Sequence, residues 1–131
     1  MVNEQMVDTI WKFFRENPNK TPVQGCFYVR YDEKNASCCA ITAFCLGGGH
    51  LKEENLISAN SRGMLFEKMA DLEYTPPFKC GIIAGWDSDQ EDHPEKELYI
   101  KKSNQEEYEK GFYTGREAWK QVQEDRKVVV T

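Results

Sequence analysis

Six carboxylates are concentrated in residues 87–97, where Lys96 is the one lysine. Three of them, Asp87, Asp89 and Asp92, offer the hard oxygen ligands that Ca²⁺ and Mg²⁺ prefer. The segment lacks the glycine and the terminal glutamate that an EF-hand loop requires. We therefore predict a solvated acidic connection without a bound metal. Two alternatives stay open, a divalent-cation site and an acidic docking surface for a basic partner.

Cysteines are the second group of residues that could do chemistry, and the chain has five: Cys26, Cys38, Cys39, Cys45 and Cys80. Cys26 would need a general base to act as a nucleophile, and His50 and His93 are the two histidines of the sequence. Cys38 and Cys45 would share a helix face and could bind Zn²⁺ with His50, although the spacing fits no standard zinc motif. The odd number and the absence of a C-x-x-C pair predict reduced, mostly buried thiols. We expect no catalytic residue, no metal and no cofactor.

A pattern of one aromatic residue and two glycines occurs twice in the chain, as Phe78-x-x-Gly81-x-x-x-Gly85 and as Tyr108-x-x-Gly111-x-x-x-Gly115. A glycine inside a helix costs about 0.8–1 kcal/mol relative to alanine, so four such positions call for a reason. Glycines four residues apart lie on one helix face, where a second backbone can approach closely. We predict that the two segments are helices packed against each other through these residues. Alternatively, one face receives a partner or a ligand, or the repeat is a coincidence and 79–86 is a buried strand.

The spacing of apolar residues predicts the helices that would position these groups, at 4–16, 38–46, 53–72, 76–87 and 104–124. Ser37 is the expected N-cap of the second helix, and residues 61–63 could divide the third into two. Ser103 and Glu106 form a capping box for the last helix. Short strands are expected at 26–32 and 98–102, and 128–130 is either a closing strand or a frayed tail. The predicted fold class is α+β, mostly helical, with about five helices and a small antiparallel sheet.

The composition describes an ordinary globular chain and excludes several classes of protein. With 131 residues, of which 40% are hydrophobic and 30% charged, residues 1–131 are expected to form a single globular domain. A formal net charge of −5 removes the electrostatic attraction that dominates nucleic-acid binding, so no nucleic-acid partner is expected. No apolar run is long enough for a membrane span, and the first residues do not read as a signal peptide. We therefore expect a cytoplasmic protein with no membrane partner.

The sequence carries no motif that identifies an activity. It has no Walker A loop, no H-E-x-x-H and no G-x-S-x-G. The hypothesis that fits best is a small, soluble, non-enzymatic protein-binding or regulatory domain, whose partner is another protein or a second copy of itself. The alternative is a small thiol-dependent or metal-assisted enzyme that uses Cys26 or the acidic segment 87–97.

Overall fold

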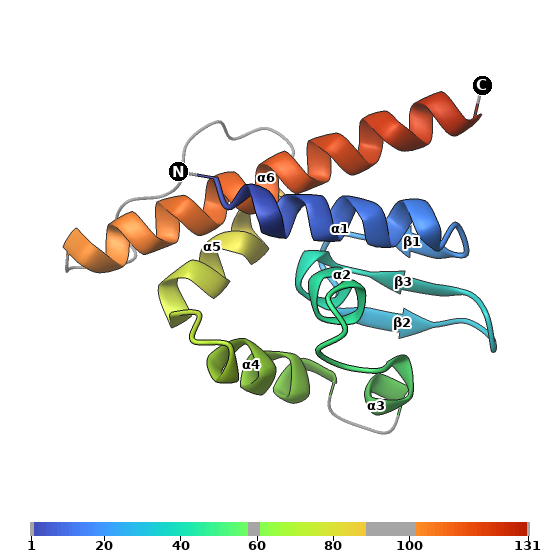
Figure 1. The fold of residues 1–131 in the computed structure, drawn as a ribbon, viewed down its shortest axis with the longest axis horizontal. Helices are drawn as coiled ribbons and strands as arrows, with labels where there is room; N and C mark the ends of the chain where they lie inside the picture. Colours follow the sequence, from blue (N-terminus) through green and yellow to red (C-terminus); the bar gives the residue numbers. More distant parts are fainter. Residues whose placement is uncertain (1, 58–60, 89–101, 131) are drawn as a thin grey trace.

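The computed structural model describes residues 2–57, 61–88 and 102–130, and the side chains of the last helix as far as residue 126. These parts of the chain form six helices and three short strands (Figure 1). In chain order they are α1 (Glu4–Glu16), β1 (Lys20–Pro22), β2 (Tyr28–Arg30), β3 (Ala36–Cys38), α2 (Ala40–Gly47), α3 (Glu53–Ile57), α4 (Ser61–Asp71), α5 (Pro76–Asp87) and α6 (Lys102–Val130). The mostly helical α+β class is confirmed. None of the described helices is both long and apolar enough to cross a lipid bilayer.

The sheet is mixed, which corrects the prediction of an antiparallel sheet. Its strand order is β1-β3-β2, with β1 parallel and β2 antiparallel to the central strand β3. Sequence patterns did not indicate β1, because it has three residues and ends in Pro22. Proline donates no ladder hydrogen bond and is tolerated in an edge strand such as this one.

Ser37 does not cap a helix, because residues 36–38 form the central strand β3 instead. The Ser37 hydroxyl lies 2.9 Å from the hydroxyl of Tyr31. Cys39 is the N-cap of α2, which therefore begins two residues later than predicted. The apolar run that suggested one helix is shared between a fully buried strand and a buried helix, two environments that periodicity alone does not separate.

The other predicted boundaries differ mainly at the ends of helices. The segment 53–72 contains two helices, α3 and α4, with residues 61–63 forming the first turn of α4. The last helix is longer than predicted, since Ser103 already lies inside α6 and 128–130 continue the helix instead of forming a strand or a frayed tail. The strand predicted at 98–102 falls outside the described residues, apart from Lys102 in α6.

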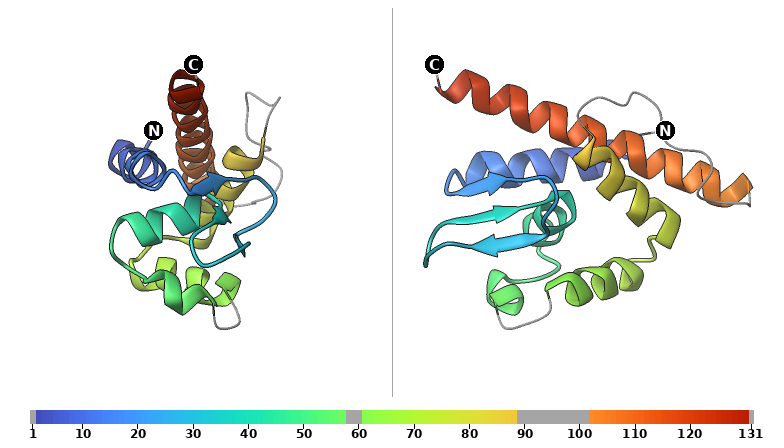
Figure 2. Two further views of the ribbon diagram at one scale, coloured as in Figure 1. Left: turned by 90° about the vertical axis from the view of Figure 1, so that its right-hand side faces the viewer. Right: turned by 180° about the vertical axis from the view of Figure 1, so that it is seen from behind.

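Helix α1 packs against both α2 and α6, and the core lies between these helices and α5 (Figure 2). Asn3 caps α1 by accepting a hydrogen bond from the amide of Met6 at 3.1 Å. The amide of Asn3 donates to the buried Thr114 hydroxyl at 2.9 Å, which ties the start of α1 to the middle of α6. Trp86 of α5 is 1% exposed and stacks on Phe14 of α1, with ring centroids 6.0 Å apart. The last turn of α5 is thereby anchored in the core.

Helices α5 and α6 form the most extensive contact between any two elements, and their glycines lie in it. The Cα hydrogen of Gly81 points at the Tyr108 carbonyl, and a Cβ there would lie 2.8 Å from the amide nitrogen of Phe112. In return, a Cβ on Gly111 would overlap the carbonyl group of Phe78. These are backbone atoms, which cannot turn aside as a flexible side chain can. The segment 79–86 is therefore helical, and the two repeated motifs face each other.

The second glycine of each motif repeats this arrangement one turn later. A Cβ on Gly85 would overlap the carbonyl of Phe112, and a Cβ on Gly115 would overlap the carbonyl of Ile82. A step of four residues along α5 thus matches a step of four residues along α6, so the two helices run in the same direction where they touch. The contact fixes α5 in place, with its opposite face turned toward α2 and α4.

Candidate functional site

A pocket of about 310 Å³ lies beside α5, and neither of the α5 glycines that contact α6 lines it. Its walls come from four separate stretches of chain: the loop at 25–27, the start of α2, the first half of α4 and the outer face of α5. Apolar side chains make up most of the lining, namely Phe27, Ala40, Ile41, Phe66, Ile82, Ile83 and Trp86. The polar members are Cys26, Cys39, Arg62, Cys80 and Asp87. An apolar pocket with a few converging polar groups is the usual form of a binding site.

The loop that closes one side of the pocket is hydrogen-bonded to the last turn of α5. The indole nitrogen of Trp86 donates to the carbonyl of Val23 at 2.7 Å, and Gln24 Nε2 donates to the carbonyl of Trp86 at 2.8 Å. The amide of Gly25 donates to a carboxylate oxygen of Asp87 at 3.0 Å. Gly25 has a φ of 82°, a conformation that glycine adopts without strain. The wall carrying Cys26 is therefore held in place by backbone and side-chain bonds.

Asp87 and Cys26, which belong to two different sequence predictions, line this one pocket. Asp87 is the last residue of α5 and accepts the bond from Gly25, so it is part of a wall and not of a free acidic loop. Burial raises the pKa of its carboxyl group, and the bond from Gly25 opposes that change. Residues 89–97, the rest of the predicted acidic connection, lie outside the described residues. In the described parts of the chain, no group of three or more His, Cys, Asp or Glu side chains is arranged to hold a metal ion.

The structure divides the cysteines into three buried and two exposed thiols. Cys38, Cys39 and Cys45 are buried, whereas Cys26 and Cys80 are exposed, and all five are free. Burial raises the pKa of Cys38 and of Cys45 to about 12, which keeps these two thiols protonated and unreactive at neutral pH. The prediction of mostly buried thiols holds for these three. Both exposed thiols line the pocket.

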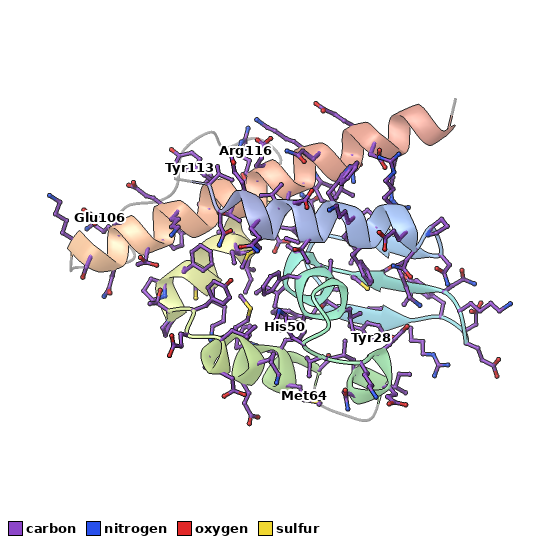
Figure 3. The ribbon with its side chains drawn as sticks, viewed as in Figure 1. Tyr28, His50, Met64, Glu106, Tyr113 and Arg116 are labelled. Atoms are coloured by element: carbon purple, nitrogen blue, oxygen red, sulfur yellow. The ribbon has the colours of Figure 1, made fainter. Side chains whose placement is uncertain are left out.

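The helix face that Cys38 and Cys45 were expected to share does not form, because the first lies in strand β3 and the second in helix α2. His50 lies beyond the end of α2, with its ring 5.2 Å from that of Phe44 (Figure 3). It is not among the residues that line the pocket, so the structure does not place it beside Cys26. His93, the other predicted base, lies outside the described residues.

Cys39 occupies the start of α2, where free backbone amides favour a negative charge. Burial nevertheless raises the pKa of this thiol, while bonds from Thr42 and from the amide of Ile41 act in the opposite direction. The Thr42 hydroxyl lies 3.5 Å from the Cys39 sulfur and donates to the carbonyl of Phe27 at 2.7 Å. Cys39 thus contributes a protonated, weakly polar surface to the floor of the pocket.

Two cations meet on one aromatic wall of the pocket. The guanidinium carbon of Arg62 lies 5.3 Å from the ring centroid of Phe66 and 6.0 Å from that of Phe27. The ammonium nitrogen of Lys79 lies 4.5 Å from the same Phe66 ring. The Phe27 and Phe66 rings contact each other edge to face, with centroids 5.5 Å apart. This aromatic pair therefore joins an apolar wall to a positively charged rim.

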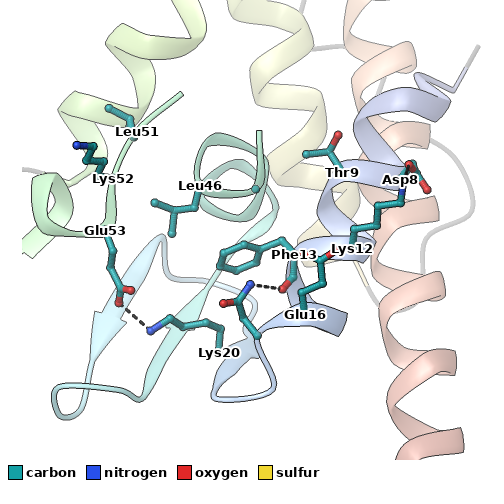
Figure 4. A pocket seen from close by; sticks show the side chains of 12 residues that line it. Asp8, Thr9, Lys12, Phe13, Glu16, Lys20, Leu46, Leu51, Lys52 and Glu53 are labelled. Carbon is teal, nitrogen blue, oxygen red and sulfur yellow. Dashed lines mark hydrogen bonds and ion pairs between the residues drawn. The ribbon is translucent and has the colours of Figure 1, made fainter. Parts of the chain in front are cut away.

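A second, larger pocket of about 560 Å³ lies between α1 and the segment that links α2 to α3 (Figure 4). The ammonium group of Lys20 donates to Glu53 Oε2 at 2.9 Å and to the carbonyl of Lys34 at 2.8 Å. The hydroxyl of Tyr28 donates to the same Glu53 oxygen at 2.6 Å. Burial alone would raise the pKa of Glu53, but the bonds from Tyr28 and Lys20 outweigh it and hold that pKa below its usual range. These groups bond to one another, so the network stabilises the junction of β1, β2 and α3.

The six residues predicted from the glycine motif, Phe78, Gly81, Gly85, Tyr108, Gly111 and Gly115, lie at the α5–α6 contact, and none of them lines the 310 Å³ pocket. Arg62, Phe66 and Phe27 were not foreseen as site residues. They come from elements far apart in sequence, and no spacing rule connects them. One local signal was available: Gly25 directly before Cys26 indicates a tight bend that turns a thiol toward the surface.

Comparison of the chain with protein-family models, with curated proteins and with solved structures gave no match. The features of this chain that bear on its function are therefore the pocket and the charged rim beside it.

Proposed function

We propose that this protein is a non-enzymatic binding domain that takes an apolar side chain of a partner protein into the pocket between α2, α4 and α5. The observation that carries this proposal is the pocket itself, with its aromatic and aliphatic walls and a volume of about 310 Å³. Pockets for whole ligands occupy roughly 300–1,000 Å³, so this one is suited to a single large group. Interfaces commonly place one buried anchor residue in such a pocket.

Exposed apolar residues on neighbouring elements favour a protein over a small molecule as the partner. Among the described residues, the large hydrophobic side chains that are exposed are Val29, Tyr31 and Ile57. Val29 lies in the edge strand β2, Tyr31 directly after it, and Ile57 at the end of α3. Strand β2 continues from the Phe27 wall of the pocket, and α3 precedes the helix that carries Arg62. A partner protein could cover these side chains while its anchor fills the pocket.

Thiol catalysis, the alternative hypothesis, has one observation in its favour, the exposure of Cys26 and Cys80 in a common pocket. A thiol nucleophile needs a base or a positive environment that lowers its pKa. Arg62 supplies a positive charge in the lining, but none of the described residues that line the pocket is a histidine that could act as the base, and the buried Cys39 has a raised pKa. The site is better suited to binding than to attack on a substrate.

Two capped peptides test the binding proposal. N-acetyl-Gly-Gly-Phe-amide offers an anchor side chain, and N-acetyl-Gly-Gly-Ala-amide is the same peptide without it. At millimolar concentration the first should shift the backbone NMR signals of Cys26, Phe27 and Ile83, and the second should leave them unchanged. The proposal is wrong if neither peptide shifts these signals.

A pocket-filling variant provides the control. Cys80 is exposed and lines the pocket, so Cys80→Phe should occupy the space and abolish the response to the phenylalanine peptide. Ala70→Phe adds the same ring to an exposed position of α4 that does not line the pocket, and should preserve the response. Shifts that persist in Cys80→Phe would place the peptide elsewhere and contradict the proposal.

A further inference from the structure

We propose that the partner's anchor is its C-terminal residue, and that the terminal carboxylate binds at the Arg62–Lys79 rim while the apolar side chain enters the pocket. This inference rests on the proposed function and names the chemistry of its ligand. It starts from the distribution of charge around the pocket, which is uneven along α5.

Two positive groups contact the Phe66 wall of the pocket, Arg62 within the lining and Lys79 beside it. Arg62 and Lys79 are both within cation–π distance of the Phe66 ring. Among the residues that the structure describes, no carboxylate forms an ion pair with either of them, although the chain as a whole carries a net charge of −5. Two cations without an acidic partner on the same aromatic ring attract an anion more strongly than either does alone.

The one acid in the pocket lining lies at the other end of α5. Lys79 and Asp87 are eight residues apart in this helix, which corresponds to about 12 Å along the axis. Asp87 accepts its hydrogen bond from Gly25 and does not neutralise the rim at Phe66. An anionic ligand is therefore oriented, with its charged group at the Phe66 end and away from Asp87.

The short distance between the cation and the apolar wall favours a C-terminal residue. The guanidinium of Arg62 lies 5.3 Å from the centre of a ring that is itself part of the pocket wall. A C-terminal residue carries its side chain and its carboxylate on the same carbon atom, so one residue can reach both features. An internal Asp or Glu beside an apolar residue would point to the opposite side of an extended peptide. Arginine also suits the planar carboxylate, to which it can donate two parallel hydrogen bonds.

Three peptides with the same anchor distinguish these cases. N-acetyl-Gly-Gly-Phe with a free C-terminus should bind about tenfold more tightly than its amide, a difference expected when one charge-assisted contact is lost. N-acetyl-Gly-Asp-Phe-amide, which carries its carboxylate on the preceding residue, should bind no better than the uncharged amide. Dissociation constants from NMR titration give the comparison, and the advantage of the free acid should shrink as salt is raised.

Two variants connect the effect to the rim. Arg62→Gln should reduce the tenfold ratio between the affinities of the free acid and the amide to about one, whatever the variant does to the affinity of the amide itself. Lys120→Gln, on the exposed surface of α6, changes the net charge equally and should have no effect.

The outcomes separate the two proposals. If the acid and the amide bind equally well, the C-terminal inference is wrong while the binding function stands. If the aspartate peptide binds as tightly as the free acid, the rim binds any nearby carboxylate and does not select a C-terminus, and the inference is again wrong. If none of the three peptides binds, both proposals fail together.

Discussion

Helix α5 has two faces that differ in almost every physical respect. One face carries Gly81 and Gly85 and lies so close to α6 that a single methyl group would overlap its backbone. The other face carries Cys80 and Ile83, lines a pocket of about 310 Å³ and has open space in front of it. The first face needs residues without a side chain, because the backbone of α6 occupies that space. The second face carries side chains that another molecule can contact.

The difference between the faces teaches where a sequence motif is to be expected. A close contact between two helices needs small residues at a fixed spacing, and fixed spacing is visible in a sequence. The pocket is assembled from four stretches of chain, so its residues follow no common spacing. The most conspicuous pattern of this sequence accordingly marks a structural contact, and the candidate site lies on the opposite side of the same helix.

Adding one carbon atom to the glycine face should have the largest effect on stability. Gly85→Ala improves helix propensity by about 1 kcal/mol, yet the new methyl would meet the backbone of Phe112 and force the helices apart. We expect a net loss of about 2–3 kcal/mol and a melting temperature lower by roughly 6–12 °C. Ala70→Gly, at an exposed position in the last turn of α4, gives the propensity effect without a contact and should cost no more than about 1 kcal/mol. A Gly85→Ala protein that melts at or above the wild-type temperature would disprove the close contact.

Trp86 connects the two faces, and changing it should have the next largest effect. Trp86→Phe retains a ring that can stack on Phe14 but removes the hydrogen bond that the indole donates to Val23. We expect a loss of about 1–2 kcal/mol in urea unfolding. Because the Val23 bond holds the loop that carries Cys26, this thiol should also react faster with a maleimide. Unchanged Cys26 reactivity would show that the loop does not depend on the Trp86 bond.

Adding a whole ring to the pocket face should cost little by comparison. Cys80→Phe places the new side chain at an exposed position, and cysteine and phenylalanine have similar helix propensities. We expect the free energy of unfolding to change by about 0.5 kcal/mol or less. If this variant loses as much stability as Gly85→Ala, the two faces of α5 do not differ in the way described.

The smallest expected effect concerns the protonation of Asp87. Burial raises the pKa of this carboxyl group in the folded state, so the folded protein holds the proton more tightly than the unfolded chain does. The charged form is therefore slightly destabilising at neutral pH, and this penalty disappears as the pH falls through the raised pKa. Asp87→Asn should be more stable than the wild type at pH 7, but only by a few tenths of a kcal/mol, because solvent still reaches the partly desolvated carboxyl group and screens its charge.

The pH dependence checks the sign of that effect. The Asp87→Asn variant can still accept the bond from Gly25 through its amide oxygen, so this bond is weakened and not lost. The difference in unfolding free energy between the two proteins should vanish below about pH 3, where both side chains are uncharged. A variant that is less stable than the wild type at neutral pH, and equal to it in acid, would mean that the charged carboxylate is stabilising.

Sequence reasoning predicted the helices well where apolar residues recur at helical spacing, as in 4–16 and 76–87, which match α1 and α5. It missed strand β1 and assigned Ser37 to a helix N-cap although this residue lies in strand β3. Strands of three residues contain too few positions to show alternation. The parallel pairing in the sheet could not be predicted from local patterns either, because strand direction depends on pairings between residues far apart in the sequence. For the site, the sequence pointed to Cys26 and Asp87 separately, but only the folded chain brings them to one pocket with Arg62.

The number of glycines on each helix determines how far α5 and α6 can slide along one another. If α6 moved by one turn so that Gly115 took the place of Gly111, Trp119 would arrive where Gly115 now meets Ile82. A shift in the other direction would bring Glu107 against the backbone of Phe78. Neither side chain fits, so the register is locked and α5 does not yield by sliding when something enters the pocket. The wall that carries Ile83 therefore limits the size of the entering group. The loop at 23–27 is hydrogen-bonded to the same helix, so adjustment to a partner has to come from α4.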